Sequence, residues 1–183
     1  MVLVGDEQRF WGLVWPDVDG VVVDGVEVVE DAVRIDVHAG QRAVNCPACG
    51  MAASRVHSMY RRRLADRPIG GRRVFLMLMV RRFFCDNVAC KRRTVAEQVE
   101  HLTTPYRRRT QAVARMVQAI GLAVGGRAGA RLADYLPVRV SRDVIVREVR
   151  RAPGPAVGPG DGARDRRVRL PQGRHLRHRA HRR

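Results

Sequence analysis

Residues 72–90 read RRVFLMLMVRRFFCDNVAC, and this stretch decides what fold the chain can adopt. Its centre, Val74–Val80, is apolar on both faces, as in a central strand that is covered on both sides. A turn signal at 68–71 (PIGG) precedes it, and the alternating run Val56–Tyr60 precedes the turn. The apolar strand then leads directly into Cys85. The sequence therefore predicts a β-hairpin that carries cysteines at its ends.

The four cysteines occur as two close pairs. Cys46 and Cys49 form a C-x2-C knuckle followed by Gly50, and Cys85 and Cys90 form a C-x4-C pair further along the chain. Thiolates at this spacing bring four sulfurs to one tetrahedral point, as zinc requires in closed structural sites, and glycine permits the tight turn beneath the metal. The sequence therefore predicts zinc. The other interpretations are two disulfides, which need an oxidising compartment, or four free thiols.

Other polar residues lie close to the cysteines in the sequence. His57 is a potential ligand, but with four cysteines available we expect it to be a solvent-facing histidine on a strand. Four thiolates around a divalent ion carry a local charge of about −2. Arg82, Lys91, Arg92 and Arg93 are expected to offset that charge and to favour deprotonation of the thiols.

Charge and composition divide the chain into four predicted segments: a leader (1–45), a zinc-binding domain (46–104), a helix-turn-helix domain (105–151) and a disordered linker and basic tail (152–183). In the leader, Val33–Val37 alternates with polar residues, and the polar turn Glu30-Asp31 joins it to Val26–Val29, which predicts a β-hairpin. The tail begins with prolines and glycines and continues with arginine and histidine. It has too few apolar residues to fold alone.

The hydrophobic period changes from that of a strand to that of a helix after Thr104. Pro105 suits the first turn of a helix, an apolar stripe at i, i+3, i+4 and i+7 starts at Val113, and Gly125-Gly126 ends the helix. A second helix is predicted over about 127–136. Ser141 is a natural N-cap for a third helix that runs to Arg151, with arginines opposite its apolar face. Three short helices of this kind match a helix-turn-helix, and the predicted fold class is α+β.

The formal net charge is +17, and Lys91 is the one lysine, so every other positive charge in this sum is an arginine. Residues 46–151 hold 23 basic residues against seven acidic ones, a balance that favours a phosphate-tracking face over a solvated surface of mixed sign. From the third helix, Arg147 and Arg150 are placed to reach guanine edges. The candidate DNA-binding residues are Arg61, Arg62, Arg63, Arg72, Arg73, Arg81, Arg82, Arg92, Arg93, Arg107, Arg108, Arg109, Ser141, Arg142, Arg147, Arg150 and Arg151.

Five motifs follow one another in the middle of the chain: CPACG (46–50), SRVHSMYRRRLADRPIGGRRV (54–74), VRRFFCDNVACKRRTVAEQ (80–98), AIGLAVGGRAGARLA (119–133) and VSRD (140–143). In combination they resemble the N-terminal half of bacterial insertion-sequence transposases of the ISL-three group, over about residues 20–151. The resemblance implies that a zinc-binding domain and a helix-turn-helix recognise the terminal inverted repeats of the element. It also implies that Cys46, Cys49, Cys85 and Cys90 are zinc ligands and that Ser141–Arg151 is the recognition helix.

The catalytic half of that family has no counterpart here. Its RNase H-like domain uses an Asp-Asp-Glu triad and divalent metal, whereas Asp161 and Asp165 are the sole acidic residues after Arg151. We therefore expect no catalytic residues and no enzyme activity. One permitted reverse translation of residues 162–181, shifted by one base, reads ALGTDEFAFRKGVTYGTVLI and resembles the start of the family's catalytic domain. We hypothesise that the tail is frameshifted sequence.

The expected function is zinc-dependent binding of double-stranded DNA at insertion-sequence ends, in the bacterial cytoplasm and associated with the nucleoid. Further candidate partners are the full-length transposase and a second copy of the chain. No apolar run is long enough to span a membrane, and the acidic, tryptophan-containing N-terminus does not look like a secretory signal. The alternative function is that of an RNA-binding zinc-ribbon module, because arginine-rich fingers also bind RNA.

Overall fold

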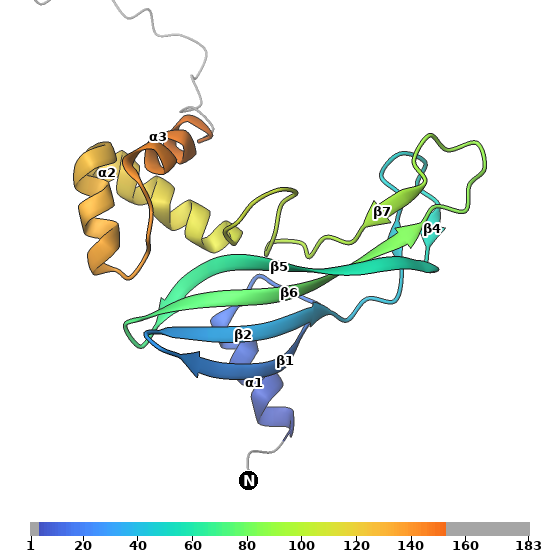
Figure 1. Ribbon diagram of the computed structural model, residues 1–183, viewed down its shortest axis with the longest axis horizontal. Coiled ribbons are helices and arrows are strands. Elements are labelled where there is room, and N and C mark those ends of the chain that lie inside the picture. Colours follow the sequence, from blue (N-terminus) through green and yellow to red (C-terminus); the bar gives the residue numbers. More distant parts are fainter. Residues whose placement is uncertain (1–3, 153–183) are drawn as a thin grey trace, which may run out of the picture. The chain divides into compact units, whose positions relative to one another are not determined.

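The computed structural model describes residues 4–152, so the predicted tail and its frameshift lie outside the described residues. The elements are α1 (Val4–Val14), β1 (Val21–Val29), β2 (Ala32–Ala39), β3 (Val44–Asn45), β4 (Ala52–Ala53), β5 (Val56–Ile69), β6 (Arg72–Phe84), β7 (Thr94–Ala96), α2 (Gln111–Tyr135) and α3 (Arg142–Arg150) (Figure 1). Among the described residues, no helix is both long and apolar enough to cross a membrane.

The predicted hairpin is present as β5 and β6, which pair antiparallel from Val56↔Phe83 to Ile69↔Arg72. Gly70 and Gly71 close the turn with φ of 57° and 73°, a region that glycine adopts without strain. β6 is a central strand, because β2 pairs with its other edge in parallel and the sheet order is β1-β2-β6-β5. β7 adds to the last residues of β6, just before the cysteine loop.

The predicted leader hairpin is also present, with β1 and β2 antiparallel and Val29 paired to Ala32 across the Glu30-Asp31 turn. The leader is not a separate layer, however. Ile35 and Val37 of β2 lie beside Leu76 and Leu78 of β6 in the register of one continuous sheet. That sheet therefore crosses the predicted segment boundary at residue 45.

The core lies on one face of the sheet. Val74, Leu76, Leu78 and Val80 alternate along β6 and are buried together with residues of β2 and with Trp15, which follows α1. The opposite face of β6 is half-buried, and there the guanidinium of Arg63 lies 3.8 Å from the Phe75 ring centroid. The expectation that Val74–Val80 is covered on both faces is therefore wrong for the second face. A helix packs on one side, and arginine side chains lie on the other.

The helical region differs from the prediction at its start. The first helix begins at Gln111 and not at Pro105, because Thr110 is the N-cap and accepts a hydrogen bond from the backbone N–H of Val113. Gly125, with φ of 75°, interrupts α2 where the sequence predicts an end, so α2 contains the first two predicted helices joined at a kink. The predicted cap of α3 is present, since Ser141 Oγ accepts from the Val144 N–H at 3.4 Å.

The α2–α3 contact depends on small residues. A Cβ atom placed on Gly121 would lie 2.5 Å from methyl groups of both Ile145 and Val149, and one on Gly129 would lie 3.2 Å from Ile145. Ile145 is fully buried in the cluster that joins the two helices. Close approach of the helix backbones at these glycines therefore fixes the position of α3 on α2.

Candidate metal centre and nucleic-acid interface

Two loops bring the cysteines together at one end of the β5–β6 hairpin. Cys46 directly follows β3, and its carbonyl accepts from the Gly50 N–H at 2.7 Å, which closes the C-x2-C turn. Gly50 has φ of 73°, in agreement with the predicted need for glycine. Cys85 directly follows β6, and its N–H donates to the Arg93 carbonyl at 3.0 Å, so the second loop returns at once to β7.

The four sulfur atoms form a single cluster. All ligand atoms of Cys46, Cys49, Cys85 and Cys90 lie within 4.8 Å of one another. The Cys46–Cys90 and Cys49–Cys85 sulfur distances are 3.9 Å and 3.6 Å, too long for disulfides, and all four thiols are free. Tetrahedral Zn–S bonds of about 2.3 Å place sulfurs about 3.8 Å apart. The donor set and its spacing therefore fit a tetrahedral zinc ion, and the disulfide interpretation is excluded by these distances.

The local environment makes the thiols unequal acids. Hydrogen bonding from the backbone N–H of Ala48, with further help from Cys49, lowers the pKa of Cys46 to about 7. At Cys85 the Asn87 N–H lowers the pKa, but burial and the neighbouring thiols outweigh it and raise the pKa to about 12. Crowded thiols resist ionisation without a cation beside them, because each thiolate repels the next. A divalent metal removes that repulsion.

Residues 42–90 match the family model of the zinc finger of IS204/IS1001/IS1096/IS1165 transposases. We refer to this segment as the zinc ribbon. It contains all four cysteines, and zinc is the metal that the match and the four-sulfur cluster indicate. No curated protein and no solved structure matches the chain.

His57 lies outside the sulfur cluster. It is exposed on β5, its ring meets Phe84 edge-on at 4.6 Å between centroids, and its Nδ1 lies 2.9 Å from Ser58 Oγ. Beside it, Arg55 pairs with Asp86 at 2.5 Å and covers the same phenylalanine ring. These contacts join the start of β5 and the residue before it to the end of β6 and to Asp86, which follows Cys85.

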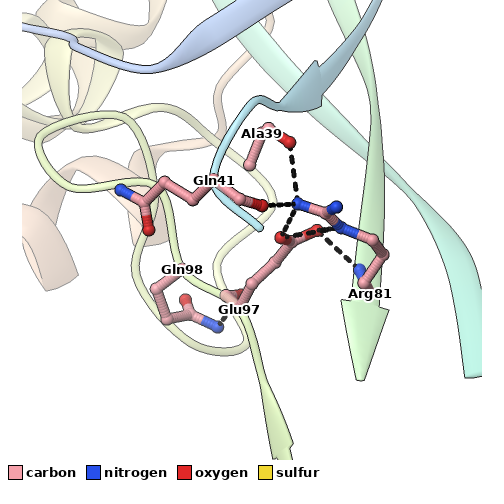
Figure 2. Close-up of polar contacts among 5 residues, drawn as sticks. All are labelled: Ala39, Gln41, Arg81, Glu97 and Gln98. Carbon is pink, nitrogen blue, oxygen red and sulfur yellow. Dashed lines mark hydrogen bonds and ion pairs between the residues drawn. The ribbon is translucent and has the colours of Figure 1, made fainter. Parts of the chain in front are cut away.

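Several arginines in the candidate DNA-binding set have internal partners. Figure 2 shows Arg81, whose guanidinium contacts the Glu97 carboxylate at 2.8 Å and donates to the carbonyls of Ala39 and Gln41. Glu97 is almost fully buried, and it also accepts from the Arg81 backbone N–H at 2.6 Å. Arg81 therefore joins the ends of β2, β6 and β7 just before the zinc ribbon's second cysteine pair, which is a structural role.

Four further arginines of the set also bind the protein itself. Arg62 donates to the carbonyls of Thr104 and Arg107 at 3.1 Å and 2.8 Å. Arg72 donates to the Glu30 carbonyl at 3.3 Å, and Arg73 pairs with Asp31. Arg107 makes two hydrogen bonds to the Glu148 carboxylate, of 2.8 Å and 3.0 Å. In each case the partner lies about 40 residues away in the sequence.

The remaining candidates are open to a ligand. On α3, Arg142, Arg147 and Arg150 are exposed while Ile145 and Glu148 are buried, so α3 presents a basic outer face as predicted. Arg151 is exposed but pairs with Glu148 at 3.1 Å, and the Ser141 hydroxyl serves as the α3 cap. Exposed arginines without an acidic partner in the described part of the chain also occur around the zinc ribbon and the 104–110 loop: Arg61, Arg63, Arg82, Arg92, Arg93 and Arg108. Arg109 is half-buried.

Sequence patterns gave no indication of two features near these residues. α1 was not predicted, and its neighbour Trp15 donates from Nε1 to the buried carboxylate of Asp66 at 2.6 Å. The Thr110 hydroxyl donates to the other oxygen of the same carboxylate, also at 2.6 Å. Arg115, on the first turns of α2, lies beside the arginines of the 104–110 loop. Asp66 lies within the motif 54–74, but nothing in that motif indicates its two donors, and Arg115 lies in none of the five motifs.

Proposed function

We propose that Cys46, Cys49, Cys85 and Cys90 bind one Zn²⁺ and that the chain is the DNA-binding N-terminal part of an ISL-three-type transposase. Its proposed target is the terminal inverted repeats of the element. The observation that carries the proposal is a four-sulfur cluster inside a segment that matches the zinc finger of transposases. The proposed setting is the bacterial cytoplasm, in association with the nucleoid.

The proposed role of the zinc is structural. Cys46, Cys49, Cys85 and Cys90 would hold the ion with four thiolates, which would join the β3–β4 turn to the loop after β6 and leave no open position for a substrate. Gly50 and the backbone N–H of Arg92, which lies 3.4 Å from Cys90 Sγ, shape the two loops around the sulfurs. Metal binding thus stabilises the end of the hairpin that carries basic residues such as Arg92 and Arg93.

Two kinds of contact with DNA are proposed. The outer face of α3, with Arg142, Arg147 and Arg150, is the proposed recognition surface, because a helix that exposes arginines fits the major groove. Exposed arginines of β5 and the zinc ribbon are proposed to neutralise phosphates. The proposed partner is therefore double-stranded DNA, and further partners are the full-length transposase or a second copy.

We propose that this chain does not cleave DNA strands. Two-metal phosphoryl transfer requires several carboxylates at one place. The acidic residues Asp66, Glu97 and Glu148 are buried and bonded to internal donors on different elements. Across residues 4–152, the cysteines form the one group of three or more potential metal ligands.

The test is a binding comparison with the zinc-loaded full chain. We expect tighter binding to a duplex that carries the inverted repeats flanking the gene than to a shuffled duplex or a structured RNA. The double variant R147Q/R150Q should lose most of this preference, by about tenfold or more. R9Q, which removes one charge of the same type from exposed Arg9 on α1, is the control for loss of an arginine away from α3. Tighter binding to RNA would overturn the proposal in favour of the RNA-binding alternative.

A further inference from the structure

A basic cavity of about 230 Å³ lies where the 104–110 loop, the first turns of α2 and the last turn of α3 meet. It is lined by five arginines and a single carboxylate, that of Glu148. The arginines are Arg107, Arg108, Arg109, Arg115 and Arg151. Such an excess of one sign around a concave surface attracts an anion of matching size.

The carboxylate in the cavity is already engaged. Glu148 is buried, receives two hydrogen bonds from Arg107 and pairs with Arg151 at 3.1 Å. Glu148 therefore balances one of these two positive charges, and both arginines form part of the wall. Arg108, Arg109 and Arg115 also line the cavity and have no acidic partner among residues 4–152.

The position of Arg109 is electrostatically unfavourable without an anion. Its side chain is half-buried, and burial is the main reason that the pKa of its guanidinium is lowered. The charges of Arg147 and Arg107 lower it further, although Glu148 acts in the opposite direction. A second negative charge in the cavity would compensate for the lost hydration and for the repulsion among the arginines.

The walls of the cavity are held before any ligand arrives. Ala65 of β5 donates to the Arg108 carbonyl at 2.9 Å and accepts from the Thr110 N–H at 3.0 Å, so the loop is fixed to the edge of the sheet. Thr110 in turn caps α2 and bonds the buried Asp66. The cavity therefore opens at the positive end of a helix dipole, beside donors whose backbone is fixed.

We propose that Arg108, Arg109 and Arg115 form a binding pocket for one phosphate group, and that a backbone phosphate of the bound DNA occupies it. The DNA part of this inference rests on the proposed function. Guanidinium groups are the side chains that best match phosphate oxygens, because they donate two parallel hydrogen bonds. The pocket would hold the sugar–phosphate backbone beside α3 while the outer face of α3 meets the bases.

The first experiment measures the salt dependence of duplex binding for the zinc-loaded full chain and for R109Q, R115Q and the control R9Q. Each pocket variant should make the log–log slope against salt shallower by about 1 and should weaken binding by about tenfold at low salt, equally for specific and shuffled duplexes. R109K should have the salt dependence of the natural chain, because lysine keeps the positive charge that R109Q removes. R115Q changes an exposed residue, so it tests the pocket even where R109Q unfolds.

The second experiment identifies the source of the phosphate. In a scan of duplexes with single methylphosphonate substitutions, one neutralised position should weaken binding of the natural chain but leave R115Q binding unchanged. Inorganic phosphate should raise the melting temperature of the natural chain more than that of R115Q.

If R109Q and R115Q bind DNA with the same salt dependence as R9Q, the proposed phosphate pocket is wrong, although the proposed DNA binding is not. A chain that binds no duplex, but is stabilised by inorganic phosphate through Arg115, would overturn the DNA function and support the pocket as a site for free phosphate. If the chain binds no duplex and inorganic phosphate does not stabilise it, both proposals are wrong.

Discussion

The carboxylate of Asp66 shows how much of this protein depends on single side chains. It is 6% exposed, and its two oxygens accept from Trp15 Nε1 and Thr110 Oγ1 at 2.6 Å each. These contacts join the end of α1, β5 and the cap of α2. A buried carboxylate with two donors therefore holds three segments together at one point.

We predict that D66A destabilises the protein by about 2–3 kcal/mol, because two buried donors lose their partner. Urea denaturation followed by tryptophan fluorescence measures the change. D17A, at an exposed position after Trp15, should shift the free energy of unfolding by less than about 0.5 kcal/mol. Equal midpoints for the two variants would contradict a structural role for Asp66.

At the scale of elements, the metal centre is built from two loops, one after β3 and one after β6, that contain few apolar contacts. Its buried cluster consists of Cys46, Cys85, Cys90 and Val95, with Val44 packed against it. Such a cluster is too small to fold by hydrophobic burial alone, so metal binding must supply much of its stability.

We predict that zinc binding at pH 7 releases more than two protons per ion. The pKa of Cys85 is about 12 and that of Cys90 is also raised, so both thiols hold their protons until zinc replaces them. Zinc affinity should consequently fall as the pH falls, because protons then compete for every sulfur. Calorimetry in buffers of different ionisation enthalpy counts the protons, and release of fewer than one would contradict a four-thiolate site.

The packing of α3 against α2 gives a second prediction at this scale. G121A places a methyl group 2.5 Å from atoms of Ile145 and Val149, so the helices must separate. We expect a loss of about 1–3 kcal/mol in the free energy of unfolding and weaker binding to the inverted repeats.

The control for G121A is G12A in α1, where nothing lies within 4 Å of the added carbon. In a helix this change should be neutral or stabilising by up to about 1 kcal/mol. If G121A also proved neutral, the close packing of α3 would not be required for its position.

At the scale of the whole molecule, the basic residues have three different roles. Some, such as Arg81 and Arg107, hold elements together through buried acids. Others line the pocket beside α2 or lie exposed on α3 and the zinc ribbon. The nine arginines after residue 151 lie outside the described residues. The net charge of +17 therefore overstates the charge that residues 4–152 can offer to DNA.

The hypothesis that the tail is frameshifted sequence predicts a catalytic domain in the neighbouring reading frame of the DNA downstream of this gene. Sequencing the locus and its flanks tests this, and the inverted repeats needed for the binding assays would be found in the same reads. Downstream DNA without such a frame would show that the frameshift hypothesis is wrong.

The sequence by itself determined the local features of this protein. Cysteine spacing with Gly50 indicated the metal centre, the PIGG turn and the alternating strands indicated two hairpins, and Ser141 marked the start of α3. These signals are readable because each depends on residues a few positions apart, where backbone geometry fixes which side chains can meet. The predicted start of α2 was wrong by several residues, since Thr110 caps the helix and Pro105 lies before its first turn.

The tertiary structure alone decided how the parts are joined. Parallel pairing of β2 with β6, the contacts of Asp66 and the division of arginines into internal and exposed groups all depend on partners about 40 or more residues apart. In the sequence an arginine looks the same whether its guanidinium contacts Glu148, a backbone carbonyl or solvent. Which partner it meets is fixed by the packing of the sheet and helices, because burial makes an unpaired charge costly.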